Sequence, residues 1–362
     1  MNNALIFIPD ISGFTNFVNA TPVEHSRHVI GELLEIILKA NTLGMVPAEV
    51  EGDAVLFYKE GPAPTFEEIL AQAKKMYVDV HTHLKRYESL RICNCDACST
   101  ASGLGIKFFV HYGEVGFIEV LGKAKPHGKS LILIHRVMKN SVPEREYLLL
   151  TKDYCDAAPD GINPPESLAK PVLGTDDFDL GEVRYEYIPL APFLSEVPPA
   201  PLPLLPERSS NPVVVERYVP AQLDDVFDFM IDLDKRALWN PDLKMVDYDP
   251  EHINRSGMTH RCLVGNQEFI VETTKIDVSK LEPDYEPAMI RTFGERAVDV
   301  PVFGTYSVYY ILKQDVKRTS IRIELHLPKV SFFKRLLLPV VRRRIGKNLG
   351  ESLNRLEAVI AQ

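Results

Sequence analysis

A chain of 362 residues is long for a single hydrophobic core, so two domains are the first expectation. Its 45% apolar and 25% charged residues are ordinary for a globular protein, and its net charge of -9 argues against general nucleic-acid binding, which requires a basic excess. Five cysteines are an odd number and give no even disulfide framework. The first residues lack the basic stretch of a signal peptide, and no apolar run reaches membrane-spanning length. We therefore expect a cytoplasmic protein.

The first domain is predicted from strand and helix patterns that alternate along the chain. Residues 3–8 are an apolar run typical of a buried strand, and Thr21, Pro22 and Glu24 form a capping box for a helix from about residue 22. The later patterns predict a hairpin at 46–58, a helix opened by a second capping box at 65–68, strands at 104–112 and 115–121, and a helix at 129–140. This order, β-α-β-β-α-β, is the split βαβ or ferredoxin-like arrangement of an α+β protein.

A proline-rich segment at 189–212 predicts a semi-rigid spacer between a domain of residues 1–188 and one of residues 213–362. The second domain should open with a strand at 213–219, a helix that includes Val226 and Phe227, and a turn at 238–243. Alternating patterns then predict strands at 259–264, 267–276, 287–295, 304–313 and 319–327, and a closing helix from about residue 331.

Two aspartates stand where buried strands are expected to end in turns. Asp10 ends the first apolar run, and Asp53 follows Gly52 in the predicted hairpin. Carboxylates on neighbouring strand ends can share a divalent cation, and the small residues that follow Asp10 leave backbone N–H groups free for phosphate. The pair therefore predicts a metal and nucleotide-phosphate site, the alternative being two turn residues that only cap strands or helices.

Over residues 3–188 the chain resembles the catalytic domain of class III adenylate and guanylate cyclases, in a divergent and uncharacterised bacterial branch. The residues that carry this resemblance are Phe7 to Thr15, Gly52-Asp53 and His111-Tyr112-Gly113-Glu114-Val115. The resemblance implies a homodimer that binds a nucleoside triphosphate. It further implies roles for single residues: a site for Mg²⁺ or Mn²⁺ at Asp10, Ile11 and Asp53; phosphate binding at Gly13, Phe14 and Thr15; and a transition-state cation at Arg136.

The chain departs from that family at other positions. Ile132 stands in place of the family's transition-state asparagine, and it cannot donate a hydrogen bond to phosphate. Glu49 and Lys125 fall at the base-recognition positions, where an ion pair between them would occupy the base pocket instead of reading a base. Three hypotheses stay open. They are a cyclase-like signalling protein with a degraded active site, a non-enzymatic scaffold for nucleotide sensing or dimerisation, and a lipid or polyketide binder whose first domain is vestigial.

A short segment holds three closely spaced thiols, Cys93, Cys95 and Cys98. They could ligate Zn²⁺ with His81 or His83 from the preceding helix, although their spacing is not that of a standard zinc knuckle. A redox-sensitive or merely exposed thiol loop is the alternative interpretation.

Residues 213–362 resemble the START-like, polyketide-cyclase-like (SRPBCC) helix-grip superfamily. That resemblance implies a curved sheet around the final helix and a cavity for a lipid, a polyketide or another hydrophobic small molecule. The alternative is an interior filled by side chains alone. A basic and apolar stretch at 334–347 predicts either contact with an anionic membrane surface or a solvated helix face.

Overall fold

The computed structural model describes residues 2–19, 23–92, 100–120, 122–200, 208–248, 256–277, 281–282, 284–300, 304–328 and 336–361. The chain is an α+β protein with two compact units. Unit 1 comprises Met1–Glu88 and Asp96–Ala200, and unit 2 comprises Ser89–Cys95 and Pro201–Gln362. Within the described residues, no helix is long and apolar enough to cross a membrane.

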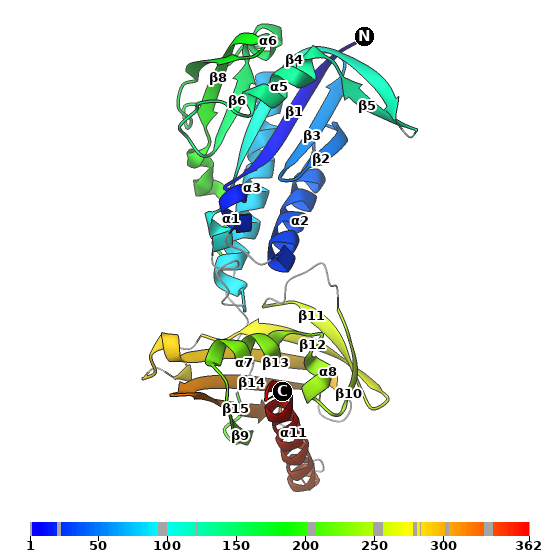
Figure 1. Ribbon diagram of the computed structural model, residues 1–362, viewed down its shortest axis with the longest axis vertical. Helices are drawn as coiled ribbons and strands as arrows, with labels where there is room; N and C mark the ends of the chain where they lie inside the picture. The colour runs from blue at the N-terminus through cyan, green and yellow to red at the C-terminus, as the bar shows by residue number, and fades with distance from the viewer. Residues whose placement is uncertain are drawn as a thin grey trace. The chain divides into compact units, whose positions relative to one another are not determined.

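Unit 1 is built on a sheet with the strand order β2-β3-β1-β4-β6-β8-β7, and β5 pairs with the far part of β4 (Figure 1). All neighbours are antiparallel except β4 and β6. The strands are β1 (Asn2–Ser12), β2 (Val46–Glu51), β3 (Ala54–Glu60), β4 (Gly105–Val120), β5 (Lys123–His127), β6 (Tyr147–Thr151), β7 (Val172–Phe178) and β8 (Gly181–Pro189). The helices are α1 (Phe14–Asn19), α2 (Val23–Lys39), α3 (Phe66–Leu90), η1 (Ala101–Gly103), α5 (Lys129–Val137), α6 (Lys152–Ala157) and η2 (Ala191–Glu196).

Strand β1 is buried because helices cover both faces of the sheet around it. Ile6 and Ile8 pack in one cluster with Ile134 of α5. Alternation along the strand turns Phe7 to the opposite face, where its ring lies 5.6 Å from that of Phe108 and where α2 and α3 lie (Figure 1). This two-sided burial explains why β1 reads as a continuous apolar run instead of an alternating one.

Helix α3 begins as the sequence predicts, with a reciprocal capping box. The Glu68 N–H donates to Thr65 Oγ1 at 3.2 Å, and the Thr65 N–H donates to Glu68 Oε2 at 2.8 Å. Of the other predicted capping box, Thr21 and Pro22 lie outside the described residues, and α2 is described from Val23.

Several predicted boundaries in unit 1 were wrong. The strands expected at 104–112 and 115–121 are one strand, β4, because Gly113 stays extended with Ser130 Oγ packed where a β-carbon would lie. Helix α5 ends at Val137 instead of residue 140. At this end the Asn140 side chain donates a hydrogen bond to the Val137 carbonyl at 2.8 Å. The segment predicted as an extended spacer begins with the end of β8 and with η2, which buries Phe193.

Unit 2 is a seven-stranded antiparallel sheet in the order β10-β11-β12-β13-β14-β15-β9. Its strands are β9 (Val213–Val219), β10 (Leu243–Asp247), β11 (Thr259–Val264), β12 (Gln267–Lys275), β13 (Ile290–Val300), β14 (Gly304–Asp315) and β15 (Arg318–His326). Its helices are α7 (Leu223–Ile231), α8 (Arg236–Trp239), η3 (Pro287–Met289) and α11 (Leu338–Ile360).

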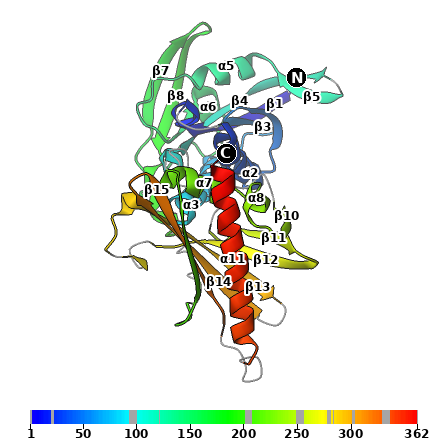
Figure 2. The same cartoon turned by 60° about the horizontal axis from the view of Figure 1, so that its bottom comes forward.

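The long helix α11 packs against β9 and α8, and it buries Leu353 and Leu356 (Figure 2). The five strands predicted after residue 258 all form. The strand expected from 287 begins at Ile290, because 287–289 form η3, and β10 was not predicted.

A buried glutamine fixes the connection that leads from α2 into β2. Gln72 of α3 is fully buried, and its Oε1 accepts hydrogen bonds from the Thr42 and Leu43 N–H groups at 2.7 and 3.0 Å. Its Nε2 donates to the Ala40 carbonyl at 2.9 Å. One side chain therefore satisfies backbone groups that the end of α2 leaves without helical partners.

We predict that Gln72→Leu lowers the free energy of unfolding of unit 1 by roughly 3 kcal/mol, because buried backbone groups would lose their partners. The matched control is Lys75→Leu on the exposed face of the same helix, which should change stability by no more than about 0.5 kcal/mol. Urea unfolding followed by circular dichroism measures both. Equal midpoints for the two variants would contradict the assigned role of Gln72.

Candidate functional site

Asp10 and Asp53 lie side by side at one end of the sheet. Asp10 is near the end of β1, where the register pairs it with Ala54 of β3 and Lys107 of β4. Asp53 occupies the β2–β3 turn, and its carbonyl accepts a hydrogen bond from the Ile11 N–H at 3.0 Å. The antiparallel pairing of β1 and β3 therefore brings together two carboxylates that are distant in sequence.

Burial makes both carboxylates costly to ionise. Asp10 is only 8% exposed, and burial, with repulsion from Asp53, raises its pKa to about 6 against the opposing attraction of Lys107. Burial also raises the pKa of Asp53. Lys107 Nζ lies 3.7 Å from Asp10 Oδ1, so one cation already faces two acids. The site favours a further positive charge.

The turn after β1 contacts an arginine that sequence analysis did not single out. Gly13 has a φ of 85°, which favours glycine, and the end of the Arg145 side chain lies where a β-carbon would be. Ser12 Oγ donates to the Arg145 carbonyl at 2.8 Å. Phe14 begins α1, and Thr15 is exposed on it. The predicted phosphate turn therefore lies beside a fixed cationic side chain.

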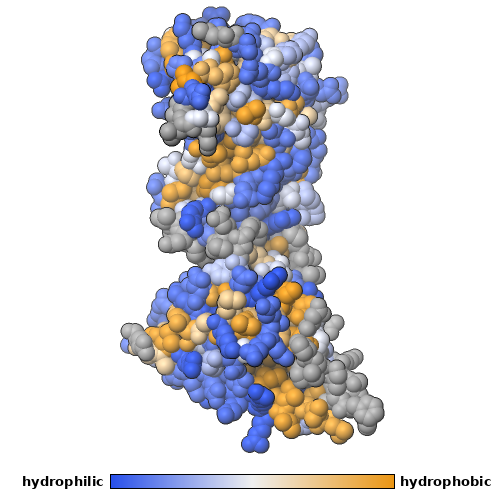
Figure 3. Space-filling model, turned by 90° about the vertical axis from the view of Figure 1, so that its right-hand side faces the viewer, coloured by the Kyte–Doolittle hydropathy of each residue, from blue (hydrophilic) through white to orange (hydrophobic). Residues whose placement is uncertain are grey.

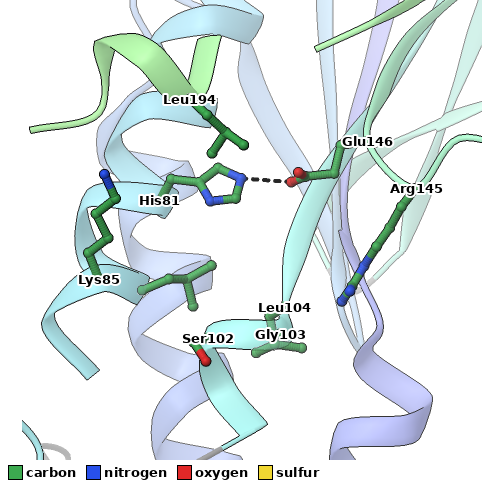
Figure 4. Close-up of a pocket in the computed structure, with 9 residues that line it drawn as sticks. His81, Lys85, Ser102, Gly103, Leu104, Arg145, Glu146 and Leu194 are labelled. Atoms are coloured by element: carbon green, nitrogen blue, oxygen red, sulfur yellow. Dashed lines mark hydrogen bonds and ion pairs between the residues drawn. The ribbon is translucent and has the colours of Figure 1, made fainter. Parts of the chain in front are cut away.

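Arg145 also borders a cavity of about 310 Å³ within unit 1 (Figure 4). Across this cavity Glu146 points toward His81 of α3, with His81 Nε2 2.7 Å from Glu146 Oε1. The Ile106 N–H and the Tyr77 hydroxyl also donate to Glu146, at 2.9 and 3.1 Å. Glu146 is thus fully engaged, and it braces α3 against β4.

The other predicted site residues form exposed ion pairs. Lys125 Nζ lies 3.1 Å from Glu49 Oε1, the predicted ion pair. Arg136 on α5 is engaged by a carboxylate, since its Nε and Nη2 donate to the two oxygens of Asp179 at 2.8 and 3.0 Å. Ile132, one turn earlier on α5, is 46% exposed. The cation and the apolar residue therefore share the exposed side of this helix.

The predicted zinc or redox loop, Cys93, Cys95 and Cys98, lies outside the described residues and stays a prediction. Both histidines considered as further ligands contact carboxylates: His81 contacts Glu146, and His83 Nε2 lies 2.8 Å from Glu32 Oε2. Throughout the described ranges, no group of three or more His, Cys, Asp or Glu residues could hold a metal ion.

Unit 2 holds a cavity of its own, of about 130 Å³, between its sheet, α8 and α11. Most of its lining is apolar, but Arg236 and Glu295 also reach it. Neither residue was singled out by the sequence, because single charges inside strands and short helices carry no local pattern.

Comparison with known proteins gives a family without an assigned function. Residues 30–147 match the family described as "Protein of unknown function (DUF2652)". The "Uncharacterized protein Rv2561/Rv2562" of Mycobacterium tuberculosis (strain ATCC 25618 / H37Rv) is 33% identical over 172 residues, which cover 47% of this chain and 77% of the relative.

Solved structures similar to the chain include nucleotidyl cyclases. The adenylyl cyclase CyaB from P. aeruginosa is 16% identical with a TM-score of 0.35, over 51% of this chain and 93% of that chain. A bacterial light-regulated adenylyl cyclase is 16% identical with a TM-score of 0.37, and the match covers 51% of each chain, so this chain spans about half the length of that protein.

These TM-scores are low, and the function proposed for the chain rests on its own residues. The mycobacterial relative, by contrast, is 33% identical to this chain over 77% of the relative's own length. The chain belongs to the family of the uncharacterised Mycobacterium tuberculosis protein Rv2561/Rv2562.

Proposed function

We propose that unit 1 binds a nucleoside triphosphate together with Mg²⁺ or Mn²⁺, and that unit 2 binds a hydrophobic small molecule as a helix-grip, START-like domain. The observation that carries the first part is the convergence of Asp10 and Asp53 beside the Gly13 turn. A buried and a half-buried carboxylate that repel each other, next to an arginine and a lysine, suit a polyanion that arrives with a divalent cation.

The residues present fit such a cation. Asp10 and Asp53 are hard oxygen donors with raised pKa values, and a positive charge between them would relieve their repulsion. Asp10, Asp53 and the carbonyl of Ile11 would hold the metal, which when bound neutralises charge on a triphosphate. Arg145 and the backbone of Gly13, Phe14 and Thr15 would contact the phosphates.

Cyclisation is not the activity that this site supports best. Ile132 offers no hydrogen bond to a phosphate, and the loss of one transition-state donor costs roughly 10²–10³ in rate. Arg136 is engaged by Asp179, and Lys125 by Glu49. We therefore favour nucleotide sensing with little or no turnover over a nucleotidyl cyclase of ordinary activity.

A second copy of the chain is the proposed partner of unit 1. Exposed apolar side chains, Val50 of β2 and Ile118 of β4 among them, lie on elements around the site, and Figure 3 shows a band of apolar surface on unit 1. Apolar surface of this kind is typical of a protein interface. In unit 2, the cavity between the sheet and α11 supports the proposed small-molecule ligand.

We predict that nucleoside triphosphates bind in the presence of Mn²⁺, and that Asp10→Asn and Asp53→Asn each weaken binding at least about tenfold, because each removes a charged metal ligand. Asp177→Asn, an exposed aspartate of β7, is the matched control. Calorimetric titration with each of the four nucleotides measures binding, and a parallel assay measures cyclic product. Equal affinity in all three variants would refute the site, whereas product lost in Asp10→Asn would reveal a cyclase.

Asp10 should lower stability near neutral pH. Its pKa is about 6 in the folded chain against 3.8 ordinarily, so its favourable contribution is complete below about pH 4 and is lost above about pH 6. Asp10→Asn should therefore raise the free energy of unfolding above pH 6 by roughly 1–3 kcal/mol, with little effect below pH 4. Urea unfolding across this range measures the difference. A variant that is less stable than the wild type at neutral pH would contradict it.

Val50→Asp should reduce the molar mass measured by light scattering from that of a dimer to that of a monomer, because a carboxylate would be buried in the interface without a partner. Val316→Asp, on an exposed turn of unit 2, is the control and should leave the dimer intact. A monomeric wild type at micromolar concentration would refute the proposed partner.

A further inference from the structure

The N-terminal end of α11 leaves large apolar side chains uncovered. Leu336 and Leu337 lie just before the helix and are 75% and 62% exposed, and Val340 in its first turn is 71% exposed. Figures 1 and 2 show this end of α11 extending beyond the strands of its sheet. Single apolar residues on a surface are ordinary, but residues of this size gathered at one place mark a site of apolar contact. We call these three residues the apolar end.

The helix carries exposed basic residues directly after the apolar end. With 3.6 residues per turn, the side of α11 that includes Val340 lies opposite the side that buries Leu353 against the rest of unit 2. Three exposed basic residues fall on the same outward side as Val340, and we call them the basic cluster: Arg343, Arg344 and Lys347.

No acidic residue interrupts this part of the helix. From Leu338 to Gly350 the sequence of α11 contains four basic residues and no acidic one. The first acidic residue is Glu351, whose Oε1 lies 3.7 Å from Lys347 Nζ. Glu351 follows Leu337 by 14 residues in the sequence, which is about 21 Å along the helix axis. The positive end of the helix dipole adds to the same potential.

The first half of α11 is held firmly on its inward side. Arg342 Nη1 donates to the Asn211 carbonyl at 2.7 Å, and its Nη2 donates to the Pro212 carbonyl at 2.8 Å. Gly346 lies against β9, with Val213 Cγ1 3.6 Å from the position of a β-carbon. The outward side is therefore presented by a helix whose position is fixed.

We propose that the apolar end and the basic cluster of α11 bind the surface of an anionic lipid membrane. The apolar end enters the boundary between the head groups and the acyl chains, and the basic cluster contacts the anionic head groups. The inference concerns a surface of unit 2, and it does not rest on the proposed nucleotide or small-molecule binding.

The spacing of the two groups suits a membrane surface. The basic cluster follows the apolar end by roughly 5 to 16 Å along the axis, and apolar side chains of interfacial helices enter the head-group boundary by about 5–10 Å. Side chains on a helix lean toward its N-terminus, so the cations reach back toward the head groups. A polynucleotide would pair with the cations alone and leave the apolar end in water.

Charge decides how the chain approaches the membrane. The net charge of -9 means that an anionic surface repels most of the chain. Charges more than about 8 Å from the surface are largely screened at physiological salt, so only the residues nearest the membrane count. An approach by the N-terminal end of α11 brings the basic cluster close and keeps Glu351 away. We therefore expect the helix to meet the membrane with this end first.

Sedimentation of the full chain with vesicles tests the proposal. The chain should partition onto phosphatidylcholine vesicles that contain about 30% phosphatidylserine at least about tenfold more strongly than onto pure phosphatidylcholine, because each of three basic residues near an anionic surface contributes about fivefold. A salt concentration of about 0.5 M should remove most of this difference.

Two variants and their matched controls separate the contributions of charge and of apolar contact. Arg344→Glu should weaken binding to the anionic vesicles at least about tenfold, whereas Arg355→Glu, an exposed position in the second half of α11, changes the net charge equally and should have no effect. Leu337→Ser should weaken binding about tenfold, whereas Val316→Ser, 84% exposed in the turn between β14 and β15, should not. All four variants should keep the wild-type unfolding midpoint.

Equal binding to the two kinds of vesicle, or none to either, would overturn the proposal. The same loss in Arg344→Glu and Arg355→Glu would show that net charge is responsible and not the basic cluster. Wild-type binding by Leu337→Ser, with a short oligonucleotide bound as tightly as the vesicles, would assign the surface to a polyanion instead. A lower molar mass of Leu337→Ser in light scattering would assign it to a second copy of the chain.

Discussion

The central constraint on unit 1 is the position of β1 between β3 and β4 with helices on both faces. Because the strand is buried on both sides, its last residues are buried as well, and Asp10 is held in a poorly solvated place. The antiparallel partner β3 begins just after Asp53, so the same pairing that completes the sheet fixes the second carboxylate beside the first. The cost of two close acids is therefore built into the topology, and Lys107 or a proton on Asp10 offsets part of it.

Unit 2 places charge differently. Its buried Arg236 and Glu295 form an ion pair, so their charges cancel. At the end of the unit 1 sheet, by contrast, the negative charges of Asp10 and Asp53 are only partly compensated. An ion pair inside an apolar interior gives little net stability, because desolvation offsets the attraction. In unit 2 the Arg236–Glu295 pair borders the apolar cavity between the sheet and α11. The two units thus accommodate buried charge in different ways.

Much of this arrangement could be predicted from sequence where the signal is local. The apolar run ending at Asp10, the capping box at Thr65 and the alternating strands of unit 2 each depend on neighbouring residues. Lys107 and Arg145 were missed because they reach the site through strand register and through a segment far along the chain. The break predicted between the strands at 104–112 and 115–121 is absent, because Gly113 lies within β4, where its missing β-carbon leaves room for Ser130. Contacts across the sheet, which no local pattern encodes, account for what was not predicted.

The contact between Gly13 and Arg145 bears on which residues the turn can accept. A β-carbon at position 13 would lie where the end of the Arg145 side chain now lies, so the guanidinium would have to move aside. A lineage that loses the arginine regains room at the turn, but it still meets the cost of a left-handed backbone. The left-handed backbone, which does not depend on the arginine, is therefore the stronger constraint on the identity of residue 13.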